Sequence, residues 1–152
     1  MAAHTVDLAG LRDLVGVPLT SPIWREVTQE AVDDFARATG DRQWIHTDPA
    51  RARLESPFGR TIAHGYLSLS LVPALLFETL EVTGASLVIN YGTNRVRFPA
   101  PVPVGSRVRL VARISGVEEV PGGLQVTLGA TVEIEGSPKP AMAAELLYRY
   151  LA

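Results

Sequence analysis

From about residue 86 to the C-terminus, apolar and polar residues alternate, which is the period of a β-strand with one buried face. The alternation is clearest in segments 107–114 and 124–134, and Pro121-Gly122-Gly123 makes a turn between them. Segments 86–98 and 141–151 carry further strand patterns. We therefore expect long antiparallel strands that bury one face of a sheet.

The first half of the chain shows helical patterns instead. Apolar residues recur at helical spacing from Thr28, an expected N-cap, to Gly40, where the helix should end. A second segment, Thr61–Leu80, is apolar in most directions, as in a helix buried in a core, and it is too short and interrupted to cross a bilayer. Pro73 should kink or interrupt that helix, because proline removes a backbone donor. The predicted architecture is a single α+β domain over residues 1–152, in which a curved antiparallel sheet wraps around a buried helix.

Composition narrows the classes of protein to consider. The length of 152 residues, 47% of them hydrophobic, suits one domain with a sizeable core. A net charge of −2 gives no basic field for nucleic acid, and no segment predicts a membrane span. The absence of cysteine excludes disulfides and thiol catalysis. The first residues lack a charged-then-apolar leader pattern, so we expect a cytoplasmic protein.

Candidate chemistry lies where the first helix ends. Asp41 and His46 follow Gly40 in a polar loop, so a carboxylate and an imidazole can converge on one water molecule and act as acid and base. Taken alone, such an aspartate is more often a turn residue, and such a histidine is more often structural. The pair His64-Gly65 adds a second signal, because the free N–H groups at the start of a helix can bind a developing oxyanion.

A metal site is another interpretation of the polar residues in this region. The loose carboxylate–imidazole set consists of Asp41, His46, Asp48 and His64. Its spacing matches no familiar zinc pattern, and the chain offers no cysteine ligand. Asp48 and Pro49 are better explained as the N-cap and first residue of a short helix over 50–54. We therefore predict no metal at these positions.

The order of three sequence blocks resembles that of the MaoC-like hydratase/dehydratase family, the single-domain R-specific enoyl-CoA hydratases with a hot-dog fold. The blocks are the Gly40-Asp41 loop that leads to His46, the AHG sequence at 63–65 that opens the apolar helix, and VRFPAPVPVG at 96–105. The resemblance covers most of the chain, from about Thr28 onward. Gln43 and Trp44 depart from the family pattern, which usually has Asn-Pro there.

The resemblance implies a reaction and a role for each site residue. It implies reversible addition of water to trans-2-enoyl-CoA, giving (R)-3-hydroxyacyl-CoA, with no metal, no redox cofactor, and coenzyme A only as part of the substrate. Asp41 and His46 are then the catalytic pair, and the Gly65 N–H polarises the thioester carbonyl. Gln43 and His64 would support the site or bind substrate. The family also pairs its sheets into homodimers, which hide an exposed sheet edge.

Several alternatives stay open at this point. One is a dehydratase that acts on 3-hydroxyacyl-ACP or 3-hydroxyacyl-CoA in fatty-acid elongation, and another is a non-catalytic acyl-thioester-binding protein, which the presence of Asp41 and His46 disfavours. A hot-dog thioesterase is disfavoured because Glu78, the only acid inside the apolar helix, lies far along it. The strand-face arginines at 95, 97, 107, 109 and 113 are either CoA-phosphate contacts or, more simply, a solvated face. The carrier, the direction and the acyl length are not determined by the sequence.

Overall fold

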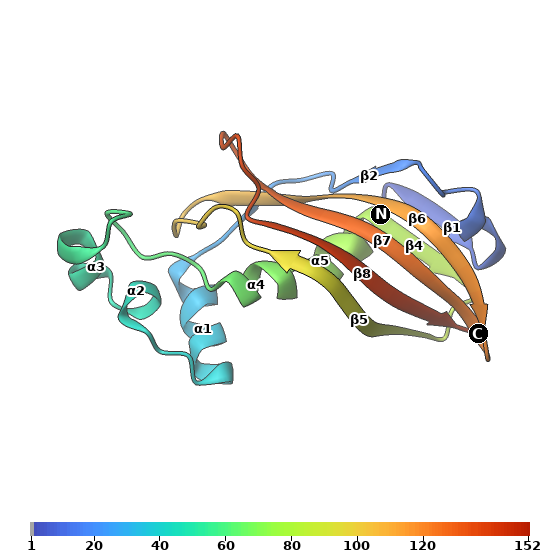
Figure 1. Cartoon of the computed structure of the whole chain (residues 1–152), viewed down its shortest axis with the longest axis horizontal. Helices are drawn as coiled ribbons and strands as arrows, with labels where there is room; N and C mark the ends of the chain where they lie inside the picture. Colours follow the sequence, from blue (N-terminus) through green and yellow to red (C-terminus); the bar gives the residue numbers. More distant parts are fainter. Residues whose placement is uncertain (1) are drawn as a thin grey trace.

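The computed structural model describes residues 2–152 as a long curved sheet with helices against its inner face and beyond one end (Figure 1). Its strands are β1 His4–Asp7, β2 Pro18–Thr20, β3 Arg25–Glu26, β4 Leu80–Thr83, β5 Leu87–Arg97, β6 Arg107–Val120, β7 Gly123–Ile134 and β8 Met142–Leu151. Its helices are the 3₁₀ turn Ala9–Arg12, α1 Gln29–Thr39, α2 Trp44–Thr47, α3 Pro49–Glu55, α4 Gly65–Ser70 and α5 Val72–Thr79. The α+β hot-dog architecture predicted from the sequence is confirmed.

The main sheet is antiparallel in the order β2-β6-β7-β8-β5, and β3 also pairs with β6. The predicted hairpin is present, since β6 and β7 pair from Val108↔Ile134 to Val120↔Gly123. Gly123 is required at the hairpin because a Cβ atom there would lie 2.0 Å from the Tyr150 carbonyl oxygen. β6 continues beyond the predicted segment 107–114 through a register shift between Ile114 and Gly116.

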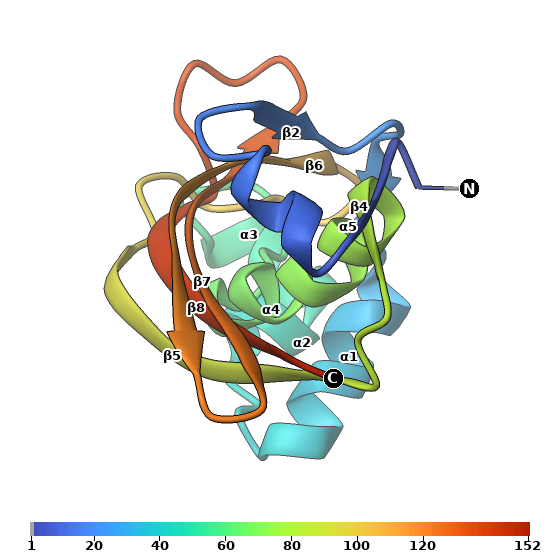
Figure 2. The same cartoon turned by 90° about the vertical axis from the view of Figure 1, so that its right-hand side faces the viewer.

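Alternate residues of β6 and β7 are buried, as their sequence period predicted. The inward residues, together with Leu75 and Leu76 of α5, belong to one hydrophobic core. Figure 2, which looks along the strands, shows the sheet curving around α4 and α5. The apolar helix thus packs one side against the concave face of the sheet, as expected for a core helix. Its other side is not buried in this chain, where Tyr66, Ser70, Ala74 and Phe77 are exposed.

The two ends of α1 follow the sequence signals. Thr28 Oγ1 accepts a hydrogen bond from the Ala31 N–H at 3.1 Å, and Gly40 ends the helix with φ +83°. At the break in the apolar helix, α4 ends at Ser70 and α5 begins at Val72, so Pro73 lies in the first turn of α5. The interruption predicted from Pro73 is confirmed. Proline is accommodated in the first turn of α5, because the backbone N–H groups of a first turn have no intrahelical acceptor.

The N-terminal segment contains elements that the sequence patterns did not indicate. β1 pairs in parallel with β4 to form a small separate sheet, and β2 and β3 pair with β6 of the main sheet. Among residues 2–152, no helix combines the length and the apolarity needed to cross a membrane. β1 and the 3₁₀ turn lie toward the end of the sheet away from α1–α3 (Figure 1), whereas β3 pairs with the first residues of β6, just before α1.

Candidate active site

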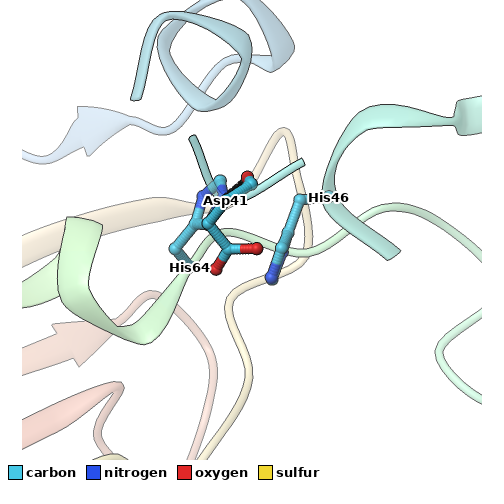
Figure 3. Close-up of side chains that lie close together, drawn as sticks. All are labelled: Asp41, His46 and His64. Carbon is cyan, nitrogen blue, oxygen red and sulfur yellow. Dashed lines mark hydrogen bonds between the residues drawn. The ribbon is translucent and has the colours of Figure 1, made fainter. Parts of the chain in front are cut away.

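Three polar side chains from separate segments meet beside the start of α4. Asp41 follows α1, His46 lies in α2, and His64 is the residue before α4. One potential ligand atom from each lies within 4.8 Å of the other two, and Figure 3 shows the carboxylate and both imidazole rings gathered at this place. The pairing of Asp41 with His46 expected from the sequence is therefore present, and His64 joins it.

His46 is held in one orientation and one tautomer. The residue is 6% exposed, and its Nδ1 lies 2.7 Å from the Ile62 carbonyl oxygen. A carbonyl oxygen only accepts, so Nδ1 carries the proton and the neutral ring keeps its lone pair on Nε2. Burial lowers the pKa of His46 below 6.5, the Ile62 hydrogen bond and Asp41 raise it, and the electrostatic interaction with His64 lowers it. The net direction is downward, which favours a neutral imidazole that can accept a proton.

The short helix that carries His46 is tied to α1 through Gln29. The Gln29 side chain donates from Nε2 to the His46 carbonyl oxygen at 2.7 Å and accepts from Thr61 Oγ1 at 2.5 Å. The Ile62 N–H donates to the Ile45 carbonyl oxygen at 3.0 Å. The sequence reasoning missed Gln29, because its contacts are to residues far along the chain and no local pattern signals them.

His64 lies deep in the site, with 2% of its surface exposed. Its Nε2 is 2.9 Å from the backbone carbonyl oxygen of Asp41, and its ring stacks on that of His46 with centroids 3.9 Å apart and planes 25° apart. Phe35 packs against it at 4.9 Å between centroids. Its Nδ1 is buried without a hydrogen-bond partner among the residues that the structure describes.

A cavity of about 310 Å³ opens beside His46 and Gly65. Its other lining residues are mainly apolar: Ile62, Ala63, Ser68, Phe98, Ala100, Pro101, Val102 and Ala141. Gly65 begins α4, so its N–H has no intrahelical acceptor and is free for a ligand. A Cβ atom at Gly65 would lie 3.0 Å from two ring carbons of Phe98, so glycine is the residue that fits here.

Other predicted positions lie outside this cavity. The Gln43 side chain is exposed, and its backbone carbonyl accepts from the His46 N–H at 3.0 Å. Asp48 Oδ1 accepts from the Arg51 N–H at 2.9 Å, and Pro49 begins α3, as predicted for an N-cap and a first residue. Two of the strand-face arginines favour the simpler explanation, since Arg107 pairs with Glu135 and Arg109 pairs with Glu133.

Asp41, His46 and His64 are also the group whose spacing suits a metal ion. An imidazole binds a metal in the plane of its ring, at about 2.0–2.1 Å for zinc. The His46 and His64 planes are only 25° apart and their centroids 3.9 Å apart, so their in-plane lone pairs do not converge within that distance. The arrangement suits proton transfer better than a metal chelated by both rings.

Comparison with known proteins places this geometry in a family. The family model described as "MaoC like domain" matches residues 12–135, most of the chain. The chain belongs to this family. The resemblance inferred from the three sequence blocks is thereby confirmed.

Relatives of this MaoC-like protein include enzymes of known name. It is 52% identical over 147 residues to "3-hydroxyacyl-thioester dehydratase Z" of Mycobacterium tuberculosis (strain CDC 1551 / Oshkosh), covering 96% of this chain and 97% of the relative. It is 43% identical over 143 residues to "Nodulation protein N" of Rhizobium leguminosarum bv. viciae, covering 93% and 89%. Among solved structures it resembles the (R)-hydratase from A. caviae involved in PHA biosynthesis, with TM-score 0.73, 27% identity, and 90% and 96% of the two chains covered.

Proposed function

We propose that the protein is a hydro-lyase that dehydrates (R)-3-hydroxyacyl thioesters to trans-2-enoyl thioesters, reversibly. The observation that carries the proposal is a buried His46, fixed with its basic Nε2 free, beside Asp41 and an apolar cavity. The relative at 52% identity is named a 3-hydroxyacyl-thioester dehydratase, which favours the dehydratase alternative over the hydratase named first from the sequence. Both names describe one equilibrium approached from opposite sides.

Dehydration moves one proton and breaks one C–O bond. The proton on carbon 2 is acidified by the thioester carbonyl, and His46 Nε2 accepts it, leaving the electron pair to form the new double bond. The His46 imidazolium then donates this proton to the hydroxyl group on carbon 3, the C–O bond breaks, and water is released. Asp41 accepts a hydrogen bond from the same hydroxyl and orients it. In the hydration direction the same groups hold water and return the proton to carbon 2.

The negative charge that builds up on the thioester oxygen needs a donor. The Gly65 N–H is the group that we assign to this role, because it begins α4 and borders the same cavity as His46. A single backbone donor of this kind is worth roughly 3 kcal/mol in the transition state. The apolar lining excludes water, which strengthens such a hydrogen bond and accommodates an acyl chain.

Assays of the purified protein test the proposal directly. (R)- and (S)-3-hydroxybutyryl-CoA are offered separately, and formation of the conjugated enoyl thioester is followed by its absorbance. We expect turnover of the (R) substrate, and a loss of about 10²-fold or more in both Asp41→Asn and His46→Gln. Asp13→Asn and His4→Gln, which change the same residue types outside the site, are the matched controls. Near-full activity in either site variant would refute the assigned pair.

A homodimer remains part of the proposal. Among residues 2–152, β5 is at the end of the strand order and pairs with β8 alone, which leaves its other backbone edge open within this part of the chain. Leu87, Ile89 and Tyr91 on this strand are exposed apolar residues. An open edge with exposed apolar side chains favours association with a second copy. A cytoplasmic location stays a prediction from the sequence.

A further inference from the structure

His64 is almost fully buried in the site, yet the proton transfers described above do not use it. It makes two specific contacts, one with the backbone that carries Asp41 and one with the ring of His46. These two residues come from different segments, the loop after α1 and the helix α2. A side chain that contacts both can fix their separation.

The first contact is a hydrogen bond to the Asp41 main chain. The acceptor is a carbonyl oxygen, so His64 Nε2 is the donor, at 2.9 Å. The other hydrogen bonds at Asp41 are longer: its N–H donates to Thr39 Oγ1 at 3.4 Å, and its Oδ1 accepts from the Gln43 N–H at 3.4 Å. Because hydrogen bonds weaken toward this length, the His64 bond is the strongest restraint on Asp41.

The second contact is the stack of His64 on His46. The rings are 3.9 Å apart between centroids, and Phe35 lies on His64 at 4.9 Å with its plane tilted by 53°. His64 is thus packed between α1 and α2, and its place one residue before α4 connects it to the backbone that bears Gly65. Movement of the His64 ring would move both members of the catalytic pair.

We propose that His64 is a positioning residue, which holds the Asp41 backbone by hydrogen bond and the His46 ring by stacking, so that the two act on one substrate oxygen. The proposal rests on the proposed function of Asp41 and His46. The substrate meets those two groups and the Gly65 N–H, while His64 acts through them. A misplacement of about 1 Å in such a pair can cost roughly 10²-fold in rate.

Two substitutions separate the two contacts. His64→Phe keeps an aromatic ring for the stack and removes the donor, whereas His64→Gln keeps an amide donor and removes the ring. His64→Phe should lower kcat by about tenfold or more with little change in KM and in melting temperature. His64→Gln should retain more of kcat, and its kcat/KM profile should shift on the acid side. A residue with a packing role alone would change the melting temperature and leave kcat intact.

Nuclear magnetic resonance gives a readout that does not depend on turnover. The chain has three histidines, so the ring signals of His4 and His46 are easily distinguished in a His64 variant. The titratable groups that act on His46 are His64, which lowers its pKa, and Asp41, which raises it. In His64→Gln, loss of the covering ring should raise the His46 pKa, because burial is the largest cause that lowers it. In His64→Phe, backbone order parameters should fall at Asp41.

The outcomes distinguish this inference from the proposed function. Wild-type protein without activity on any 3-hydroxyacyl thioester would refute the function, and the two NMR measurements would still judge the contacts of His64. If His64→Phe keeps the wild-type kcat and unchanged backbone order parameters at Asp41, the proposed role of the His64 hydrogen bond to Asp41 is refuted. An unchanged His46 pKa in folded His64→Gln would refute the proposed effect of the stacked His64 ring on His46. If His64→Phe does not fold, His64→Gln alone tests the proposal. A wild-type kcat, together with an unchanged acid side of the pH profile of kcat/KM in that variant, would exclude a positioning role.

Discussion

The backbone donor at Gly65 can be deleted by proline with little disturbance of the fold. Gly65 is the first residue of α4, a position that proline favours, and its N–H has no intrahelical acceptor to lose. The preceding residue, His64, has ψ 139°, within the range that proline requires of its neighbour. Gly65→Pro therefore removes the proposed oxyanion donor while the helix can still begin at the same residue.

Crowding by Phe98 must be separated from the loss of the donor. Any Cβ at position 65 would lie 3.0 Å from Phe98 Cγ and Cδ2 and 3.2 Å from Cε2, whereas carbon atoms pack at about 3.5–4.0 Å. Phe98 is 39% exposed, so it can be shortened without opening the core. In a Phe98→Ala background, which removes all three crowding ring atoms, Gly65→Ala adds the Cβ and keeps the N–H. Gly65→Pro in the same background adds the Cβ and removes the N–H.

The comparison of these two double variants isolates the donor. Loss of one oxyanion donor costs about 10²–10³-fold in kcat, or roughly 2.7–4 kcal/mol. We expect kcat of Gly65→Pro/Phe98→Ala to be lower by this factor than kcat of Gly65→Ala/Phe98→Ala, measured on (R)-3-hydroxybutyryl-CoA at saturation. Circular dichroism and melting temperature serve as controls for folding. Equal kcat values in the two folded double variants would refute the role of the Gly65 N–H.

Three further predictions concern other parts of the molecule. Because the His46 pKa is lowered in the folded protein, the unfolded chain binds a proton first as pH falls below 6.5. Stability should therefore decrease on going from pH 7 to about pH 5 by more in wild type than in His46→Gln, as measured by urea unfolding, and equal decreases would contradict this. Pro73 borders a cavity of about 280 Å³ beside α4 and β8, and Pro73→Ala should straighten the helix and shift kcat/KM from long toward short acyl chains. If the ratio of kcat/KM between long and short acyl chains is unchanged in a folded variant, Pro73 has a structural role alone. If β5 forms the dimer edge, Tyr91→Lys should yield monomers in sedimentation, whereas Glu118→Lys on β6 should not.

The long strands β5 to β8 and the first helix could be predicted from the sequence because their signals are local. A two-residue period selects which side chains of β6 and β7 turn inward, and the core is built from those residues. Thr28 and Gly40 mark the ends of α1 through hydrogen bonds and backbone angles that involve only near neighbours. The interruption at Pro73 belongs to the same class, since it follows from the missing N–H of one residue.

The sequence also indicated the chemistry of the site, because Asp41 and His46 lie close together along the chain. Tertiary structure alone decided how they are held: Ile62 fixes the His46 tautomer, Gln29 ties α2 to α1, and His64 stacks on His46. These contacts join segments that are distant in sequence, and no local period or cap encodes them. They depend on how the helices pack at the end of the sheet, because only that packing brings buried polar groups within hydrogen-bonding distance of one another.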